Sequence, residues 1–396
     1  MKKINYLRKR VNLLRAGLSS IAFSWIMILA IVTSSSFAMS QNPDSIKIND
    51  NDFGIKQKSG KLEVGFITVG PVSDWGYNYQ HNQGRLEMEA RLRNKIHTVI
   101  VENVPETADV ERVMQRMCKS GAGLIFSTSY GYADSSLRVA KKNPSVTFMQ
   151  ALGSKQSLNL GTYSIAVWEP AYVCGVVAAL TTKGETRFGF LGAHPVPPIN
   201  WSVNAFCLGA QSVNPKITVD IVYTNSWYDP AAETEAAKSL AAKGVKVIYV
   251  LTDSPIAGVQ AAEHAGIYSL AHFANMSNFA PKKWITGTVW KWSSLYVDVA
   301  KKVMNGTWKG RHYAGGFKEG YVDIAPFGPD VKQLARDNAQ TVIDNIAKGK
   351  KNVFQGPIQD AQGNMRVTEG KSLTIQDILS MDWVVKGVKG APTPNK

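Results

Sequence analysis

Residues 64–85, VGFITVGPVSDWGYNYQHNQGR, decide the fold of this chain. The run Val64–Val69 is apolar, as in a buried strand, and LEMEARLR after Arg85 has helical spacing. A turn between a strand and a helix needs only a glycine or a proline, and this turn has both. Three aromatic rings, a carboxylate and an amide also lie within residues 74–79. These side chains exceed what a turn requires and indicate a surface that binds something.

The alternation of strand and helix continues along the chain and predicts parallel sheets. In the first half, strands are expected at residues 64–69, 98–101, 124–127 and 146–150, and helices at 80–93, 108–119 and 135–142. After Trp168, strands are expected at 187–191, 217–223, 245–251 and 267–270, and helices at 169–181, 199–212, 230–243 and 255–264. The tail from Asn275 is expected to hold one helix, 293–305, among loops, and to complete a hinge. We therefore predict an α/β protein with two Rossmann-like lobes.

The N-terminal residues 1–40 have the pattern of a secretory signal. MKKINYLRKRVNLLR carries six basic residues and no acid, an apolar run follows, and Ser36-Phe37-Ala38 offers a cleavage site. A retained membrane anchor is the alternative, because the apolar run approaches spanning length. No cysteine lies near the cleavage site, so there is no lipobox for lipid attachment. We expect cleavage and a free periplasmic protein.

The length predicts the division into domains, because about 350 residues after cleavage exceed what one core usually serves. Residues 41–60 are polar and rich in turn formers, which indicates a mobile lead-in. We assign residues 61–166 plus about 293–320 to the first lobe. Residues 167–290 plus about 321–390 are assigned to the second lobe.

Charge and cysteine content exclude several functions. The formal net charge of +15 falls to +9 without residues 1–40, and the remaining basic residues are scattered, which argues against a nucleic-acid partner. The three cysteines, Cys118, Cys174 and Cys207, lie among apolar residues as buried hydrophobes do, although a single disulfide stays possible in an oxidising compartment. No nucleophile elbow, metal-binding pair or phosphate loop occurs, and the six histidines are isolated. We expect no metal, no cofactor and no catalysis.

The loops after the strands are where a ligand should bind, because open parallel sheets bind ligands outside the carboxyl ends of their strands. Almost all of them carry an aromatic ring or an acid: SDWGYN (73–78), TSYGYAD (128–134), AHPVPPINW (193–201), TNSWYDP (224–230) and LTDSP (251–255). Two lobes with such edges facing each other would form a cleft lined by Trp, Tyr, Asp and Asn.

The opening stretch resembles the basic membrane protein family of substrate-binding proteins, which includes purine-nucleoside receptors. Asp74, the Tyr77-Asn78 pair and Gly84 match the family pattern. The resemblance continues through LIFSTSYGYAD, VNP at 213–215, SWYDPAAETEAAKSLAAKGVKVI, TDSP at 252–255, VDIAPFG at 322–328 and the MDWVVKGVKG tail, and so covers nearly all of the mature chain. It implies a type I periplasmic-binding-protein fold and a purine base or nucleoside that is delivered to the permease of an ABC transporter. We expect a monomer.

Purine chemistry suits these loops, since a flat base asks for stacking rings and a few polar groups. Asp74, Asn78 and Asp253 are candidates to pair with donors of the ligand. Each has a structural alternative: Asp74 would stabilise the following helix, Asn78 would cap it, and Asp253 would cap the helix after Pro255. Asp229 is assigned the structural role, because Asp-Pro commonly starts a helix.

Aromatic rings complete the candidate site. Trp75 and Tyr77 are expected to stack on a base or to cover the sheet edge, and Tyr130 is expected at the end of its strand. Trp168 would stack or pack at the hinge. The remaining candidates are Trp201, Asn204, Trp290 and Lys291. Trp201 stands where relatives often have a charged residue, and Lys291 stands near a basic residue of nucleoside-binding relatives. For Trp290 and Lys291 the alternative is one buried ring and one solvated lysine.

Two other functions compete with import. A receptor that presents its ligand to a membrane sensor would need the same closed cleft. An exported nucleosidase would use Asp74 or Asp253 as a base. Turnover of inosine or adenosine would separate the hydrolase from the two binding proteins.

Overall fold

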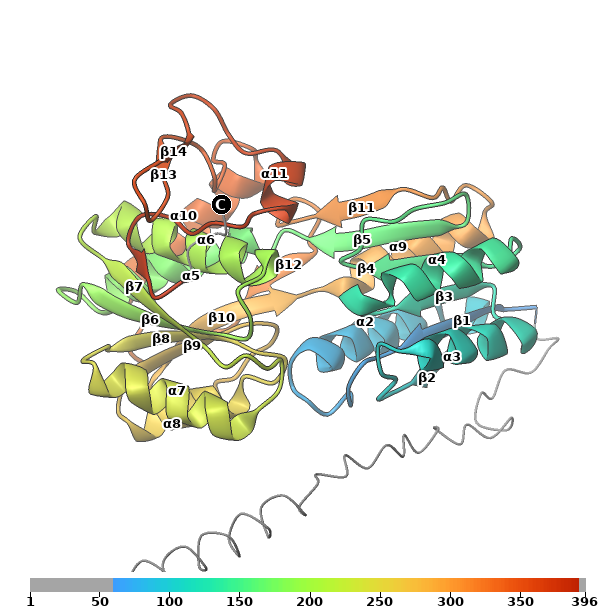
Figure 1. Cartoon of the computed structure of the whole chain (residues 1–396), viewed down its shortest axis with the longest axis horizontal. Helices are drawn as coiled ribbons and strands as arrows, with labels where there is room; N and C mark the ends of the chain where they lie inside the picture. The colour runs from blue at the N-terminus through green and yellow to red at the C-terminus, as the bar shows by residue number, and fades with distance from the viewer. Residues whose placement is uncertain (1–59, 392–396) are drawn as a thin grey trace, which may run out of the picture. The chain divides into compact units, whose positions relative to one another are not determined.

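Two mainly parallel sheets organise the chain in the computed structural model, which describes residues 60–391 (Figure 1). The predicted signal peptide, nearly all of the lead-in and residues 392–396 lie outside the described residues. No helix within residues 60–391 is long and apolar enough to cross a membrane. The α/β class with two lobes is confirmed, because each sheet is covered by helices on both faces.

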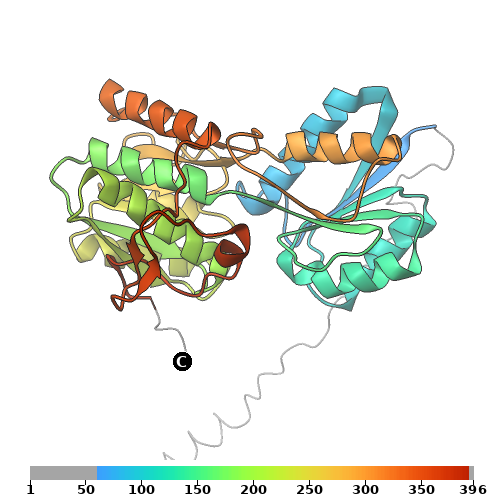
Figure 2. The same ribbon diagram turned by 90° about the horizontal axis from the view of Figure 1, so that it is seen from above.

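The first lobe is built on a fully parallel sheet. Its described strands run in the spatial order β11 (His312–Gly315), β5 (Leu160–Ile165), β4 (Thr147–Ala151), β3 (Leu124–Ser127), β1 (Leu62–Ile67) and β2 (Ile96–Val101). Helices α2 (Tyr77–Leu92) and α9 (Trp292–Met304) cover one face, and α3 (Ala108–Lys119) and α4 (Ala133–Lys142) cover the other, as Figure 2 shows from above. The predicted apolar stripe of α3 is confirmed, since Val110, Val113, Met114 and Met117 are all buried.

The second lobe has a parallel sheet with one antiparallel edge strand. Its described strands run in the order β12 (Val322–Ile324), β10 (Trp284–Trp290), β9 (Tyr268–Ala271), β8 (Val247–Leu251), β6 (Arg187–Gly192), β7 (Thr218–Tyr223) and β15 (Val388–Lys389). Among the described strands of this sheet, only β12 pairs antiparallel, with β10. Helices α5 (Trp168–Thr181) and α6 (Pro197–Val213) pack together, and so do α7 (Pro230–Ala242) and α8 (Ile256–His264).

Successive side chains on the strands of the second sheet point to opposite faces and pack in two different cores. Phe190 and Tyr249 stack at 5.1 Å within the core that contains α5 and α6. Their neighbours Leu191 and Val250 lie in the core that contains α7 and α8. This alternation is the period of a strand, so a sheet that is buried on both faces reads as a continuous apolar run.

Helix α7 begins and ends where its residues predict. The Asp229 carboxylate accepts from the N–H of Ala232 at 2.9 Å, and Pro230 is the first helical residue. Gly244 just beyond the helix has a φ of +83°, a left-handed conformation that glycine adopts without strain. The structural role that we predicted for Asp229 is confirmed.

Within the described part of the chain, three crossovers join the two sheets. They run from β5 to α5, from β10 to α9, and from β11 to β12. Backbone hydrogen bonds connect the crossovers. The N–H of Ala166 donates to the carbonyl of Gly315 at 2.8 Å, and the N–H of Lys291 donates to the carbonyl of Tyr321 at 2.8 Å. The three crossovers therefore form one hinge.

The tail is more regular than its sequence indicates. We predicted one helix after Asn275, yet this segment also contains β10, β11, β12 and helix α10 (Gln333–Ala347). Beyond them lie the hairpin β13–β14 (Ile358–Gln359 and Met365–Val367) and the short helix α11 (Ile375–Leu379). The three cysteines, all within the described residues, are free.

Candidate functional site

Asp74 holds the start of helix α2. Its two carboxylate oxygens accept from the backbone N–H groups of Gly76 at 2.9 Å, Asn78 at 2.9 Å and Tyr79 at 2.8 Å, and from the Asn78 side-chain amide at 2.8 Å. Four donors fill the lone pairs of a carboxylate. Burial raises the pKa of Asp74 even though these donors lower it. The carboxylate therefore stabilises the N-terminus of α2, the structural role that we gave as its alternative. We no longer expect Asp74 to contact a ligand.

Asn78 is engaged in the same turn. Its side-chain oxygen accepts from the N–H of Gly70 at 3.3 Å while its amide nitrogen bonds Asp74. The side chain is buried. Because both ends of the amide are paired inside the first lobe, Asn78 is not kept as a ligand contact either.

Tyr77 meets the second lobe. Its backbone N–H donates to the carbonyl oxygen of Asp253 at 3.0 Å. Its ring stands edge-on to Phe273 at 5.8 Å and to Trp290 at 5.7 Å. The phenol oxygen is buried and has no hydrogen-bond partner among the described residues. An unpaired buried hydroxyl carries a free-energy penalty. The Tyr77 hydroxyl is therefore available to bond a ligand at the seam, the contact region between the two lobes.

Trp75 also touches the second lobe but stays 40% exposed. Its indole stacks on Tyr79 at 5.0 Å with 18° between the planes, and stands edge-on to Phe279 at 5.8 Å. Its φ of 55° is left-handed, which is unusual for a bulky residue. One face of the indole is thus already stacked on a protein ring.

Asp253 follows strand β8 and has a free carboxylate. Its backbone is fixed on both sides, by the Tyr77 N–H and by the carbonyl of Trp227, which accepts from the Asp253 N–H at 2.7 Å. Helix α8 has no side-chain cap, so Asp253 does not cap it. Within residues 60–391 no hydrogen bond or ion pair reaches the carboxylate. Loss of water raises its pKa well above the usual range, and the carboxylates of Asp74, Glu106 and Glu233 raise it further.

Trp290 lies at the centre of an aromatic group at the end of strand β10. Its ring is buried and stands edge-on to Tyr77, to Phe273 at 4.7 Å and to His272 at 5.4 Å. In the described part of the chain its indole N–H has no partner. Trp290 therefore adds a second unpaired buried donor, on a ring that neighbours that of Tyr77.

Lys291 is occupied at the hinge. Its ammonium pairs with the carboxylate of Asp323 on strand β12. Its backbone N–H bonds the Tyr321 carbonyl. Lys291 thus ties the second crossover to the third, and we no longer expect it to reach a ligand.

The remaining candidates are spread over the hinge and the tail. Trp168, the first residue of α5, packs edge-on against Trp201 of α6 at 5.8 Å, and both are buried. Asn204, fully buried on α6, donates to the carbonyl of Trp383 at 3.0 Å and accepts from the N–H of Val385 at 2.8 Å. Asn204 therefore anchors the C-terminal tail, because the tail folds back over α6, and it leaves the candidate site.

Tyr130 lies where we predicted, after strand β3, and its ring is 69% exposed. The neighbouring Gly131 N–H donates to the carboxylate of Glu106 at 3.0 Å. The side-chain amide of Gln150, at the end of β4, donates to the Ser129 carbonyl at 2.6 Å. Tyr130, Gly131 and Gln150 therefore lie at the carboxyl ends of strands of the first sheet.

Sequence reasoning missed His272, Phe273 and Phe279. His272 and Phe273 directly follow β9, a strand that the pattern predicted. Because ligands lie beyond strand ends, the position of these residues after a predicted strand was the signal that points to them. Burial lowers the pKa of His272 to about 3, and its Nδ1 lies 2.6 Å from the Tyr249 hydroxyl, so the ring is neutral.

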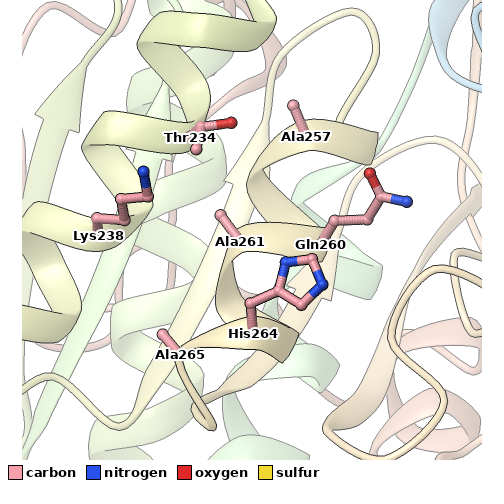
Figure 3. Close-up of a pocket in the computed structure, with 7 residues that line it drawn as sticks. All are labelled: Thr234, Lys238, Ala257, Gln260, Ala261, His264 and Ala265. Carbon is pink, nitrogen blue, oxygen red and sulfur yellow. The ribbon is translucent and has the colours of Figure 1, made fainter.

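A separate pocket lies between helices α7 and α8, away from these residues. Its volume is about 390 Å³, and Figure 3 shows Lys238, Gln260 and His264 around it. It includes none of the predicted site residues. No group of His, Cys, Asp and Glu within the described residues could hold a metal ion.

Comparison with known proteins gives the site its context. Residues 61–361 match the family described as ABC transporter substrate-binding protein PnrA-like. A purine-binding protein of Brucella abortus is 41% identical over 338 residues, which cover 85% of this chain and 95% of that protein. A putative ABC transporter glucose-binding protein of Haloferax volcanii is 28% identical over 343 residues, 87% of this chain and 84% of that protein.

Solved structures agree on the fold. An ABC transporter solute-binding protein from Conexibacter woesei superposes with a TM-score of 0.63 at 20% identity. The match covers 74% of this chain and 98% of that one. It supports the type I periplasmic-binding-protein architecture.

Proposed function

This chain belongs to the family of PnrA-like ABC transporter substrate-binding proteins, and from that premise we propose that it captures a purine base or purine nucleoside. The family consists of binding proteins rather than enzymes, and its members deliver a small molecule to a transporter permease outside the cytoplasm. We further propose that this protein works in the periplasm after its N-terminal signal is removed.

One observation carries the ligand proposal: Asp253, whose carboxylate is free, accepts a backbone hydrogen bond from Tyr77, and the Tyr77 hydroxyl and the indole N–H of the neighbouring Trp290 ring are both unpaired. A carboxylate accepts hydrogen bonds, whereas an indole N–H only donates. A ligand that satisfies all three must present donors on one edge and acceptors on another. Purines do this around a flat ring.

The surrounding rings suit a flat ligand. Tyr77, Phe273 and Trp290 contact one another edge-on, so they form an apolar wall rather than a closed stack. Stacking on an aromatic ring contributes roughly 1–3 kcal/mol per base. The Brucella relative, whose name states purine binding, supports the same ligand class.

Unpaired polar groups also provide selectivity. A ligand that lacks the matching donor or acceptor leaves Asp253 or Tyr77 desolvated without a partner, and such a loss costs about 1–3 kcal/mol. Sites of this kind discriminate more strongly than apolar pockets of the same shape. We therefore expect purines to bind more tightly than pyrimidines and sugars.

Binding can be tested without knowing the ligand in advance. Native mass spectrometry of freshly purified protein would identify a retained molecule, and thermal unfolding with hypoxanthine, adenine, inosine, adenosine, uracil and glucose would rank candidates. A purine at a hundredfold excess over its Kd should raise the free energy of unfolding by about 2.7 kcal/mol. If glucose shifts the transition and no purine does, the ligand proposal is wrong and the Haloferax relative indicates the better class.

A further inference from the structure

The N-terminus of helix α2 divides its hydrogen bonds between the two lobes. Asp74 accepts the N–H groups of Gly76, Asn78 and Tyr79 from within the first lobe. The N–H between them, that of Tyr77, is left over and donates to the carbonyl of Asp253 in the second lobe. The first N–H groups of a helix have no partner inside the helix. Contact with the second lobe therefore completes the capping of α2.

A second contact lies beside this bond. Trp75 stacks on Tyr79 and reaches Phe279, which follows strand β9 of the second lobe. Tyr79 and Phe279 both pack against the hydrophobic core that contains α7 and α8. A residue of the first lobe thus joins the apolar surface of the second, and its burial depends on the lobes being together.

Gly76 allows the close approach. A Cβ atom at this position would lie 1.8 Å from the Asp253 carbonyl oxygen and 3.3 Å from Pro255. Real Cβ atoms do not approach backbone this closely, so only glycine is compatible with the observed contact.

We propose that residues Asp74–Tyr79 form a closure latch that holds the lobes together through Asp253 and Phe279. The latch rests on the two-lobed receptor function proposed above, but not on the identity of the ligand. Hinged binding proteins interconvert between open and closed forms, and a contact made only in the closed form shifts the population toward it. Most of the aromatic and polar side chains of this turn therefore serve closure of the two lobes.

Asp253 couples the latch to the ligand. Its carbonyl accepts the latch hydrogen bond, whereas its carboxylate is the acceptor that we propose for the ligand. A ligand that fixes the Asp253 side chain also fixes the loop that receives Tyr77. Closure and capture therefore stabilise each other, and release of ligand requires the latch to open.

Small-angle X-ray scattering of ligand-free protein tests the latch directly. Trp75→Ala and Phe279→Ala should each increase the radius of gyration, and the double variant should add little, because the two rings contact each other. The matched control is Leu86→Ala, since Leu86, at 42%, is similarly exposed to Trp75 and lies inside helix α2, which Trp75 precedes. Coincident profiles for wild type and both single variants would overturn the proposal.

Dissociation kinetics give a second readout. In Phe279→Ala, hypoxanthine should leave about 2-fold to 10-fold faster than in wild type, the range that one aromatic pair contributes. Tryptophan fluorescence can follow release, because this variant keeps every indole. Unchanged release together with unchanged scattering would reject the latch. Failure of purines to bind at all would reject the ligand proposal and leave the scattering result to decide on the latch.

Discussion

The ring of Tyr77 in the first lobe lies 5.7 Å from that of Trp290 in the second, and neither polar atom of the pair has a partner within the described residues. Buried donors left unpaired are rare in folded proteins, and here two neighbouring rings each carry one. Tyr77 also bonds the backbone of Asp253, whose carboxylate is free, and these three residues are the basis of the proposed ligand site.

Removal of the Tyr77 hydroxyl should affect binding and stability in opposite directions. Tyr77→Phe deletes an unpaired buried group, so the free energy of unfolding without ligand should be unchanged or higher by about 1 kcal/mol. Purine affinity should fall about tenfold, as measured by titration calorimetry.

Tyr313→Phe provides the matched control. The Tyr313 hydroxyl donates to the Lys309 carbonyl at 2.9 Å, so its removal should cost about 1 kcal/mol of stability and leave affinity unchanged. Loss of stability without loss of affinity in Tyr77→Phe would mean that its hydroxyl is satisfied within the protein.

Glu233 should make the ligand-free protein less stable as pH rises. It is fully buried in the first turn of α7, and burial raises its pKa to about 7 from 4.5. The folded state therefore holds this proton more tightly than the unfolded state, so stability is highest below pH 4.5 for this group and is lost as pH rises through 7. Glu233→Gln should raise the free energy of unfolding at pH 8 by about 1–3 kcal/mol.

The control for Glu233 is Glu235→Gln on the same helix, where an exposed carboxylate pairs with Lys238. Chemical denaturation at pH 5 and pH 8 should show a pH effect that shrinks only in Glu233→Gln. Equal pH dependence in wild type and Glu233→Gln would contradict the assignment.

Glu169 should hold the hinge crossovers together. Its carboxylate accepts from the Phe317 N–H at 2.7 Å, which links helix α5 to the segment between β11 and β12. Glu169→Ala leaves that N–H unpaired and should lower the free energy of unfolding by about 1–3 kcal/mol. Glu169→Gln keeps an acceptor and should restore most of the loss, as judged by urea midpoints. A deficit in Glu169→Gln as large as in Glu169→Ala would show that charge, not the hydrogen bond, matters.

Gly76→Ala should block full closure without unfolding the protein. The added Cβ overlaps the Asp253 carbonyl only when the lobes are together. Apparent affinity falls with the fraction of molecules that can close, so purine binding should weaken at least tenfold while the thermal midpoint changes little. Ser73→Ala, at an exposed position of the same turn, should bind as wild type does. Wild-type affinity in Gly76→Ala would remove Gly76 from the latch.

The alternation of strand and helix was predictable from the sequence because helices such as α3 show a helical period and most strands form short apolar runs between turn residues. Strands β5 and β10 escaped notice, since Gly161 and Gly287 interrupt runs that are buried on both faces and show no period of two. Helix α10 was missed because most of its residues are polar and only Ala335, Ala339 and Ile346 are buried.

The site was predictable only in part. Asp253 was predicted as a site residue because it follows a predicted strand, which is a topological rule. Trp290 is the last residue of strand β10, which was not predicted, so that rule did not place it. The structural roles of Asp74 and Asn78 depend on which N–H groups they meet, and a single sequence does not give that geometry. Asn204 was misplaced because nothing local in α6 indicates that the tail returns over it.

Titration calorimetry of Asp253→Asn with hypoxanthine and inosine tests the central claim most directly. A ligand donor that bonds Asp253 favours its ionised form, and a hydrogen bond to a charged group contributes about 1.5–3 kcal/mol. The Kd of whichever purine wild type binds should therefore rise about 10-fold to 150-fold. The free energy of unfolding without ligand should not fall, because the carboxylate has no partner within residues 60–391 and its neighbours repel it. Asp382→Asn, an exposed surface control, should match wild type in both. Wild-type affinity in Asp253→Asn would contradict the account.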